Sequence, residues 1–342
     1  MKYKLLFIIV QMFLILACNS KKDSTLSEKK QLDTTNISSK VQKENSSIKD
    51  LKSRLECDYL DEEPPGTTPK LFAPNLVSTK VEHSAVMFTP NGNELWFGRM
   101  YPAKIWFMKK TDGKWGKPQL SHLPKGYGEL YPYLTSDGNK LFFMSDMPIH
   151  EDGNKLRRSD GEIWFIERDG KNWSEPKHLG DNINVGNRQA VGSISSDGTL
   201  YFSASITDGN KKSTDIYKSE MVNGVYQKAD YIPELNSAQP EFSPCVAPDE
   251  SFIIISSFRG GYGLSDLFIS FRKKDGSWGT LKNLGSKINS KYKDEFPYIS
   301  PDGKYLFFNS NRPSELNSKR IPDGPGNMYW VSIDFISKNF IK

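Results

Sequence analysis

Acidic and basic side chains recur about every 50 residues along much of this chain. An acidic or amide residue precedes each of five similar apolar segments, and an arginine follows three of them. The first set is Glu82, Glu129, Gln189, Glu241 and Glu295, and the second is Arg99, Arg259 and Arg312. Converging carboxylates could act as acid and base on a glycosidic bond. Together with the arginines they could instead hold a sugar or a peptide terminus, or simply tie neighbouring repeats together.

Other chemistry has little support in the sequence. The four histidines (His83, His122, His150 and His178) do not show metal-ligand spacing, and no serine lies in a Gly-x-Ser-x-Gly motif. We therefore expect neither a metal nor a cofactor. The one enzyme alternative that survives is a glycan-cleaving site formed by Glu129, Glu241 and Glu295 at the mouth of a central channel.

These residues are carried by five copies of one hairpin pattern, at residues 88–97, 134–143, 194–202, 246–254 and 299–308. Each copy has two β-rich runs, and four copies join them by an Asn-Gly or Asp-Gly turn, which suits a tight hairpin. The fourth copy has Glu250 in place of glycine, so we expect its turn to be distorted.

A third apolar run follows each hairpin, and in four copies a second turn and a fourth run come after it. The third runs are residues 104–108, 162–166, 215–219, 266–270 and 327–331. Four strands per repeat are typical of a propeller blade. The sequence therefore predicts an all-β fold, a single β-propeller of five four-stranded blades, with Trp115, Trp173 and Trp278 packed between blades.

The fifth repeat ends after its third strand and leaves an edge to be covered. Residues 69–76, just before the first hairpin, look like the fourth strands of the other repeats. We expect them to complete blade five and close the ring. The alternative, a six-bladed ring, would need a repeat that the sequence does not show.

Because consecutive strands are antiparallel, all tight turns must lie on one side of the ring and all long connections on the other. We call the second side the long-loop face. Its segments are residues 147–161, 180–188, 205–214, 259–265, 285–294 and 312–326. Long loops on a rigid scaffold commonly bind partners, and the recurring acidic residues and arginines should lie on this face, around the channel mouth.

The hairpins resemble the WD40-like propeller repeats with a Ser-Pro-Asp-Gly turn, the repeat type of TolB and of many envelope lipoproteins. Residues 299–312 match best, and the resemblance extends over residues 69–335. It implies the fold. It does not imply one activity, because such propellers serve as protein platforms, glycan-associated modules and peptidase appendages.

The N-terminus indicates export and lipidation. Lys2 and Lys4 precede an apolar run too short to span a membrane, which ends in Leu-Ala-Cys18 and resembles a bacterial lipobox. We predict a signal peptide over residues 1–17, a lipidated Cys18 with a disordered tether over 18–65, and the propeller over 66–342. The protein should be anchored by lipid in the cell envelope, at the outer membrane, on a face that stays open.

Charge argues against nucleic acid as a partner. The chain carries +5, of which the signal contributes +2 and residues 18–55 contribute +4, so the remainder is −1. A nearly neutral domain lacks the basic surface that phosphate requires. Cys57 and Cys245 could form a disulfide, and the sequence leaves this open.

These observations favour an envelope lipoprotein whose propeller binds a protein or glycan partner through its long-loop face without catalysis. The alternatives are a glycoside hydrolase or lyase and a structural spacer in an envelope complex.

Overall fold

The computed structural model describes residues 58–151, 155–157, 160–170, 172–208, 211–316 and 326–340. The predicted signal peptide, Cys18, Cys57 and the tether up to residue 57 lie outside these ranges. Within them, no helix has the length and apolar character needed to cross a membrane. The described residues, from Asp58 onward, belong to one compact unit.

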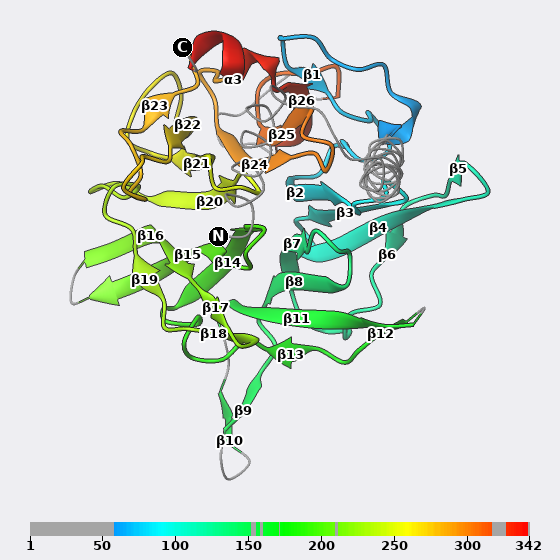
Figure 1. Cartoon of the computed structure of the whole chain (residues 1–342). Helices are drawn as coiled ribbons and strands as arrows, with labels where there is room; N and C mark the ends of the chain where they lie inside the picture. The colour runs from blue at the N-terminus through cyan, green and yellow to red at the C-terminus, as the bar shows by residue number, and fades with distance from the viewer. Residues whose placement is uncertain are drawn as a thin grey trace, which may run out of the picture. The chain divides into compact units, whose positions relative to one another are not determined.

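Five antiparallel sheets stand around a central axis as the blades of a propeller (Figure 1). Blade one contains β2 (His83–Phe88), β3 (Glu94–Arg99), β4 (Lys104–Thr111), β5 (Lys114–Trp115) and β6 (Gln119–Leu120). Blade two contains β7 (Glu129–Leu134), β8 (Lys140–Ser145), β11 (Glu162–Asp169), β12 (Asn172–Trp173) and β13 (Lys177–His178). The predicted all-β, five-bladed propeller is confirmed.

The other three blades repeat this order. Blade three contains β14 (Arg188–Ile194), β15 (Leu200–Asp208), β16 (Lys211–Ser219) and β19 (Asp230–Tyr231). Blade four contains β20 (Glu241–Val246), β21 (Phe252–Ser257), β22 (Asp266–Phe271) and β23 (Lys282–Asn283). Blade five contains β24 (Asp294–Ile299), β25 (Tyr305–Ser310), β26 (Asn327–Ser332) and β1 (Lys70–Leu71), and α3 (Asp334–Asn339) follows it.

The ring closes as the sequence predicts. Strand β1 pairs antiparallel with β26, with Lys70 opposite Trp330 and Leu71 opposite Tyr329. Phe72 follows β1 and is fully buried, with its ring 5.0 Å from that of Phe307 and 5.3 Å from that of Trp330. The N-terminal segment thus completes the sheet of blade five and seals its junction with blade one.

The core consists of five apolar clusters, each between two neighbouring blades. Trp173 of blade two packs against Trp96 of blade one, with ring centroids 5.8 Å apart. Trp278 of blade four packs in the same way against Tyr201 of blade three, at 6.2 Å. These contacts confirm the interblade role predicted for the tryptophans.

The fourth hairpin is not distorted. Glu250 adopts a φ of 57° and its amide donates to the Ala247 carbonyl at 2.8 Å, as Gly92 donates to Thr89 in blade one. The carboxylate of Glu250 accepts from the Tyr201 hydroxyl at 2.8 Å and pairs with Arg272 at 3.3 Å. These contacts with side chains of blades three and four offset the energetic cost of a left-handed backbone conformation at a residue other than glycine.

The folded unit includes residues that the sequence assigned to the tether. Tyr59 lies in the 3-10 helix η1 (Tyr59–Asp61) and is only 3% exposed, packed against Phe88, Phe307 and Trp330. Asp58 accepts hydrogen bonds from the side chains of Trp115 and Lys110. The fold therefore reaches back at least to Asp58, beyond the expected start at residue 66.

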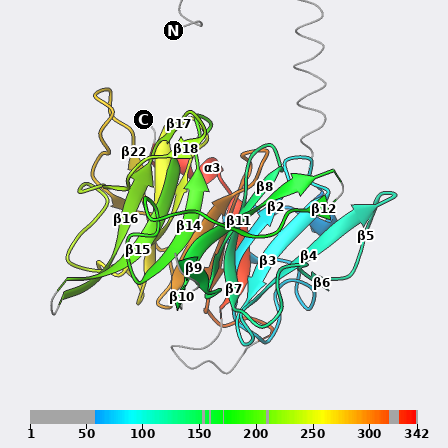
Figure 2. The same ribbon diagram turned by 90° about the horizontal axis from the view of Figure 1, so that it is seen from below.

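One expected loop of the long-loop face is a strand hairpin instead. Residues 205–208 continue β15 and pair with residues 211–214 of β16, with Ser205 opposite Thr214. A second hairpin, β9 (Ile149–Glu151) with β10 (Lys155–Arg157), projects from the connection between β8 and β11. Figure 2 shows the ring from the side, with β14 to β16 and β2 to β4 on opposite sides.

Candidate functional site

A cavity of about 460 Å³ opens on the long-loop face, where the first strands of the blades begin. All five blades contribute to its wall. Blade one supplies Glu82 and Ser84, blade two Tyr131, blade three Arg188 and Gln189, blade four Phe242, and blade five Glu295. We call this the mouth cavity.

The predicted residues divide into two groups. Glu82, Gln189 and Glu295 line the mouth cavity, whereas Glu129, Glu241 and the three arginines do not. The strand register shows which residues of this set are equivalent, but it does not separate the two groups, because Gln189 shares the register of Glu129 and Glu241. The first strand of each blade begins opposite the end of the second, and the paired residues are His83 with Arg99, Glu129 with Ser145, Gln189 with Ala204, Glu241 with Ser257, and Asp294 with Ser310.

The equivalent ring of residues is therefore His83, Glu129, Gln189, Glu241 and Asp294. Glu82 and Glu295 lie one position away from it on either side, so the equivalence expected for these two residues is wrong. Because side chains alternate along a strand, a shift of one position changes the direction of the side chain.

Glu241 is occupied by structural contacts. Its carboxylate is fully buried and accepts from the amide and hydroxyl of Ser237 at 2.8 and 2.7 Å and from the Ser257 hydroxyl at 2.8 Å. Arg259 donates to it at 2.9 Å and to the Leu235 carbonyl at 2.8 Å. Glu241 thereby fixes the connection between blades three and four.

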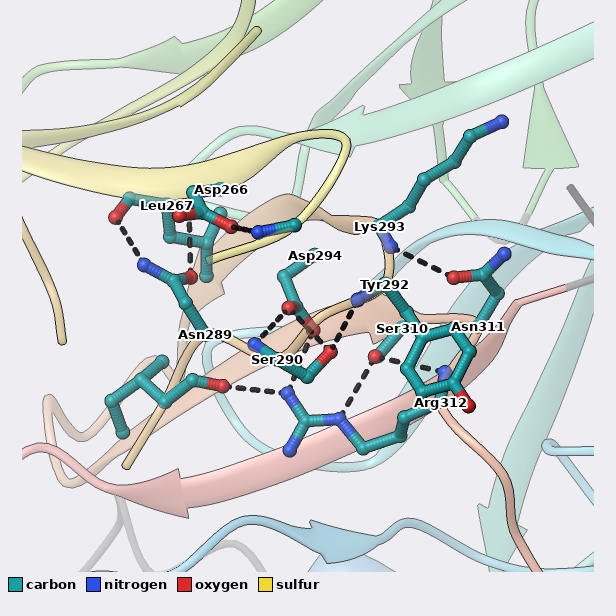
Figure 3. A network of polar contacts seen from close by, with 12 residues as sticks. Asp266, Leu267, Asn289, Ser290, Tyr292, Lys293, Asp294, Ser310, Asn311 and Arg312 are labelled. Atoms are coloured by element: carbon teal, nitrogen blue, oxygen red, sulfur yellow. Dashed lines mark hydrogen bonds and ion pairs between the residues drawn. The ribbon is translucent and has the colours of Figure 1, made fainter. Parts of the chain in front are cut away.

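Asp294 and Arg312 repeat this arrangement in blade five (Figure 3). Arg312 donates to the Asp294 carboxylate at 2.7 Å, to the Ile288 carbonyl at 2.6 Å and to the Ser310 hydroxyl at 2.9 Å. The amide and hydroxyl of Ser290 donate to the same carboxylate at 2.6 and 2.9 Å. Arg259 and Arg312 are therefore equivalent residues that brace interblade connections.

The remaining two predicted residues also have structural partners. Glu129 is buried and accepts from Lys104 at 2.7 Å. Burial raises the pKa of Glu129, and Lys104 opposes this shift. Arg99 donates to the Leu76 carbonyl at 3.0 Å and lies over the Trp106 ring, with 4.7 Å to the centroid. In the strand register it matches Ser257 and Ser310 rather than Arg259 and Arg312.

Glu82 and Glu295 are the two carboxylates that face the mouth cavity. Burial raises the pKa of both, and the nearby Lys293 opposes each shift. The charge of Glu82 also raises the pKa of Glu295. The Ser265 hydroxyl donates to Glu295 at 2.5 Å. The two carboxylates are thus close enough to repel one another in a partly desolvated site.

Two buried polar side chains in the cavity wall lack partners among the described residues. Gln189 is fully buried, and neither its amide oxygen nor its amide nitrogen has a hydrogen-bond partner in that part of the chain. The hydroxyl of Ser84, 1% exposed, is in the same state. An unsatisfied buried polar group costs about 1–3 kcal/mol, so both side chains would gain from a polar ligand.

His83 forms part of the same wall as a neutral imidazole. It is 1% exposed, and burial lowers its pKa to about 4, with a contribution from the charge of Arg99. Its Nδ1 lies 3.3 Å from the Gly326 carbonyl, and its Nε2 lies 3.4 Å from the Thr79 hydroxyl. These contacts fit a structural role for the ring.

Residues at strand irregularities, and the aromatic rings beside them, line the cavity. Tyr131, Ser243 and Phe296 have φ angles of 52°, 51° and 55°, and each comes directly before a proline. The pairing register shifts at these points. The Tyr131 and Phe296 rings lie 5.2 Å apart, and those of Phe242 and Phe296 6.1 Å apart.

Sequence reasoning missed Arg188, Tyr131, Phe242 and Phe296. The available signal was the repeated proline three residues after the acidic position, at Pro132, Pro244 and Pro297. Proline cannot donate to a strand ladder and commonly marks a bulge. The residue before each proline is the one that the bulge places at the cavity.

The arrangement of metal-binding side chains and the surroundings of Cys245 bear on two further expectations from the sequence. In the described ranges, no group of three or more His, Cys, Asp or Glu side chains is arranged to hold a metal ion. Cys245 is buried among apolar residues, and burial raises the pKa of its thiol to about 12. Cys57 lies outside the described residues, so the pairing with Cys245 that the sequence leaves open is not tested by the structure.

Comparisons with known proteins find likenesses among solved structures alone. No family model and no curated protein matches the chain. Solved structures that it resembles include TolB from Acinetobacter baumannii, at 15% identity and a TM-score of 0.44 over 74% of this chain and 57% of that protein. A thermostable family-43 glycoside hydrolase matches at 15% identity and 0.48 over 75% and 91% of the two chains. A gluconolactonase from Xanthomonas campestris matches at 12% and 0.44 over 80% and 96%.

The chain thus spans little more than half the length of that TolB. At these identities the likeness extends to the fold alone, and the chain is a five-bladed β-propeller similar to TolB and to other propeller proteins.

Proposed function

We propose that this chain is a lipid-anchored lipoprotein of the bacterial cell envelope, at the outer membrane, whose propeller binds a protein or glycan partner at the mouth cavity without catalysis. The anchor is Cys18, and the segment after it tethers the propeller to the membrane. One observation carries the binding role: fully buried Gln189 and nearly buried Ser84 belong to the lining of a cavity to which all five blades contribute, and their side-chain polar atoms have no partners in the described structure.

The geometry favours binding over the acid and base set expected from the sequence. Of Glu129, Glu241 and Glu295, the first is held by Lys104 and the second by Arg259 and two serines. A carboxylate fixed by several donors is a poor proton donor or acceptor. Those two residues therefore serve the scaffold.

A glycan-cleaving activity remains as a second candidate, because Glu82 and Glu295 share the cavity and have raised pKa values. A carboxyl group with a raised pKa can act as a general acid near neutral pH. Cleavage of a panel of envelope glycans by the full-length protein, abolished in both Glu82→Gln and Glu295→Gln, would establish this candidate in place of the binding role.

The binding role is tested by capture from detergent-solubilised envelopes with the lipidated full-length protein as bait. We compare the wild type with Arg188→Glu, which reverses an exposed charge at the cavity rim. Lys117→Glu is the matched control, since Lys117 is an exposed residue between β5 and β6 and lies outside the mouth cavity.

A partner retained by the wild type and by Lys117→Glu, and lost with Arg188→Glu, supports recruitment through the mouth cavity. A partner bound equally well by all three proteins places recruitment elsewhere and contradicts the proposal.

A further inference from the structure

We propose that the mouth cavity binds a small zwitterion, an α-amino acid or dipeptide unit, with its ammonium group at Glu82 and Glu295 and its carboxylate at Arg188. The inference rests on the proposed function, because it names the chemical group that the long-loop face would recognise on a partner.

The charges of the cavity are separated across the ring. Glu295 belongs to blade five, and Glu82 comes directly before the first strand of blade one, its neighbour. Arg188 begins β14 in blade three, which lies across the ring from the junction of blades five and one (Figure 1). The cavity is therefore acidic on one side and basic on the other.

Tyr131 connects the two sides electrostatically. Its ring lies in the cavity wall, and its pKa responds to Arg188, to Glu295 and to Glu82. Burial is the largest cause of the raised pKa of Tyr131, and Arg188 opposes the shift. Arg188, Glu82 and Glu295 thus line the same cavity as this ring.

The unpartnered Gln189 suits both ends of such a ligand. It follows Arg188 in β14, is fully buried and lines the cavity. Its amide nitrogen can donate to a carboxylate and its amide oxygen can accept from an ammonium group. Ser84, on the acidic side in blade one, offers a hydroxyl that can also accept from an ammonium group.

The size and walls of the cavity fit the same ligand class. About 460 Å³ lies in the range of small-molecule sites, and the faces of Phe242, Phe296 and Tyr131 supply apolar contacts and favour a cation. A neutral sugar would offer no charge to Arg188 or to the two carboxylates. An ion with one charge would satisfy only one side.

The probe is L-alanyl-L-alanine, and binding to the full-length protein in detergent is measured by calorimetry. Its matched analogues are the N-acetylated dipeptide, which lacks the ammonium group, and the dipeptide amide, which lacks the carboxylate. Chitobiose is the neutral glycan control. A charged hydrogen bond contributes enough that we expect the zwitterion to bind at least about tenfold more tightly than either analogue.

Substitutions of the charged cavity residues test which of them binds the ammonium group and which binds the carboxylate. Glu82→Gln with Glu295→Gln should weaken dipeptide binding about tenfold and leave the N-acetylated analogue unchanged. Arg188→Gln should weaken dipeptide binding and leave the amide unchanged. Glu234→Gln, an exposed carboxylate outside the cavity on the connection that leads into β20, is the matched control and should bind all probes as the wild type does.

Failure of this inference is distinct from failure of the proposed function. Absence of dipeptide binding, or chitobiose binding as tightly as the dipeptide, overturns the zwitterion assignment even when partner capture still depends on Arg188. Equal losses for both analogues in every variant also overturn it, because the two charges then have no separate roles.

Discussion

The guanidinium group of Arg312 lies 2.7 Å from the carboxylate of Asp294, which is fully buried. Arg259 and Glu241 repeat this pair one blade earlier at 2.9 Å. In both blades the arginine also donates to a carbonyl of the preceding connection, that of Ile288 or Leu235. Residues that looked like binding groups in the sequence thus hold successive blades together.

Breaking the Arg312 pair should destabilise the propeller. Arg312→Met leaves the buried Asp294 without its cation, and loss of one member of a buried pair costs about 3–5 kcal/mol. Urea unfolding monitored by tryptophan fluorescence gives the change in free energy. Lys287→Met, at an exposed position, is the control, and equal stability of the two variants would show that the pair is not needed.

Ring closure should depend on Phe72. Phe72→Ala removes a fully buried ring that contacts Phe307 and Trp330 at the junction of blades five and one, at an expected cost of about 3–5 kcal/mol. Leu120→Ala in β6 is the control, because Leu120 is 44% exposed in an outer strand. A loss for Phe72→Ala no larger than for Leu120→Ala would mean that the closing segment contributes little.

Ionisation of Glu82 and Glu295 should lower the free energy of unfolding as pH rises. Burial raises the pKa of both above the ordinary 4.5, so in the range just above 4.5 the folded state binds more protons than the unfolded state. The free energy of unfolding therefore falls with increasing pH there. The double variant Glu82→Gln, Glu295→Gln stays neutral, so its melting temperature relative to wild type should be higher at pH 7 than at pH 4. The same difference at both values would contradict the shifts.

Protonation of His83 should have the opposite pH dependence and lower the free energy of unfolding as pH falls. Burial lowers its pKa to about 4 from 6.5, so the unfolded state binds more protons in that interval and stability is lost as pH falls through it. The loss amounts to about 3 kcal/mol. His83→Asn does not titrate, so its stability relative to wild type should rise between pH 7 and pH 4. A constant difference would mean that His83 is protonated in the fold without penalty.

The fold could be predicted from the sequence because its repeats carry strong local signals. Turn residues and apolar runs recur five times, and the missing strand of the last repeat leaves one segment, around Lys70 and Leu71, to close the ring. Residues 205–214 were expected to form a loop, although Asp208 and Gly209 are themselves a hairpin turn signal.

The site was predicted less well because bulges change which residues face the channel. Glu82 and Glu295 reach the cavity from positions beside the aligned ring, whereas Glu129 and Glu241 on that ring are bound to Lys104 and Arg259. Glu295 lies one residue after Asp294, and Asp294 is the position equivalent to Glu129 and Glu241. All five first strands shift register at the same place, so the distance from Asp294 to the hairpin at Ile299 carried this signal in the sequence.

The central claim is that a partner docks at the mouth cavity, and photocrosslinking tests it most directly. A photoreactive amino acid replaces Met100, which lines the cavity, or Asn91, in the tight turn between β2 and β3 on the opposite face. After irradiation of intact envelopes, the account predicts a discrete adduct from position 100 that Arg188→Glu removes, and none from position 91. An adduct from position 91 alone, or one at position 100 that persists in Arg188→Glu, would contradict it.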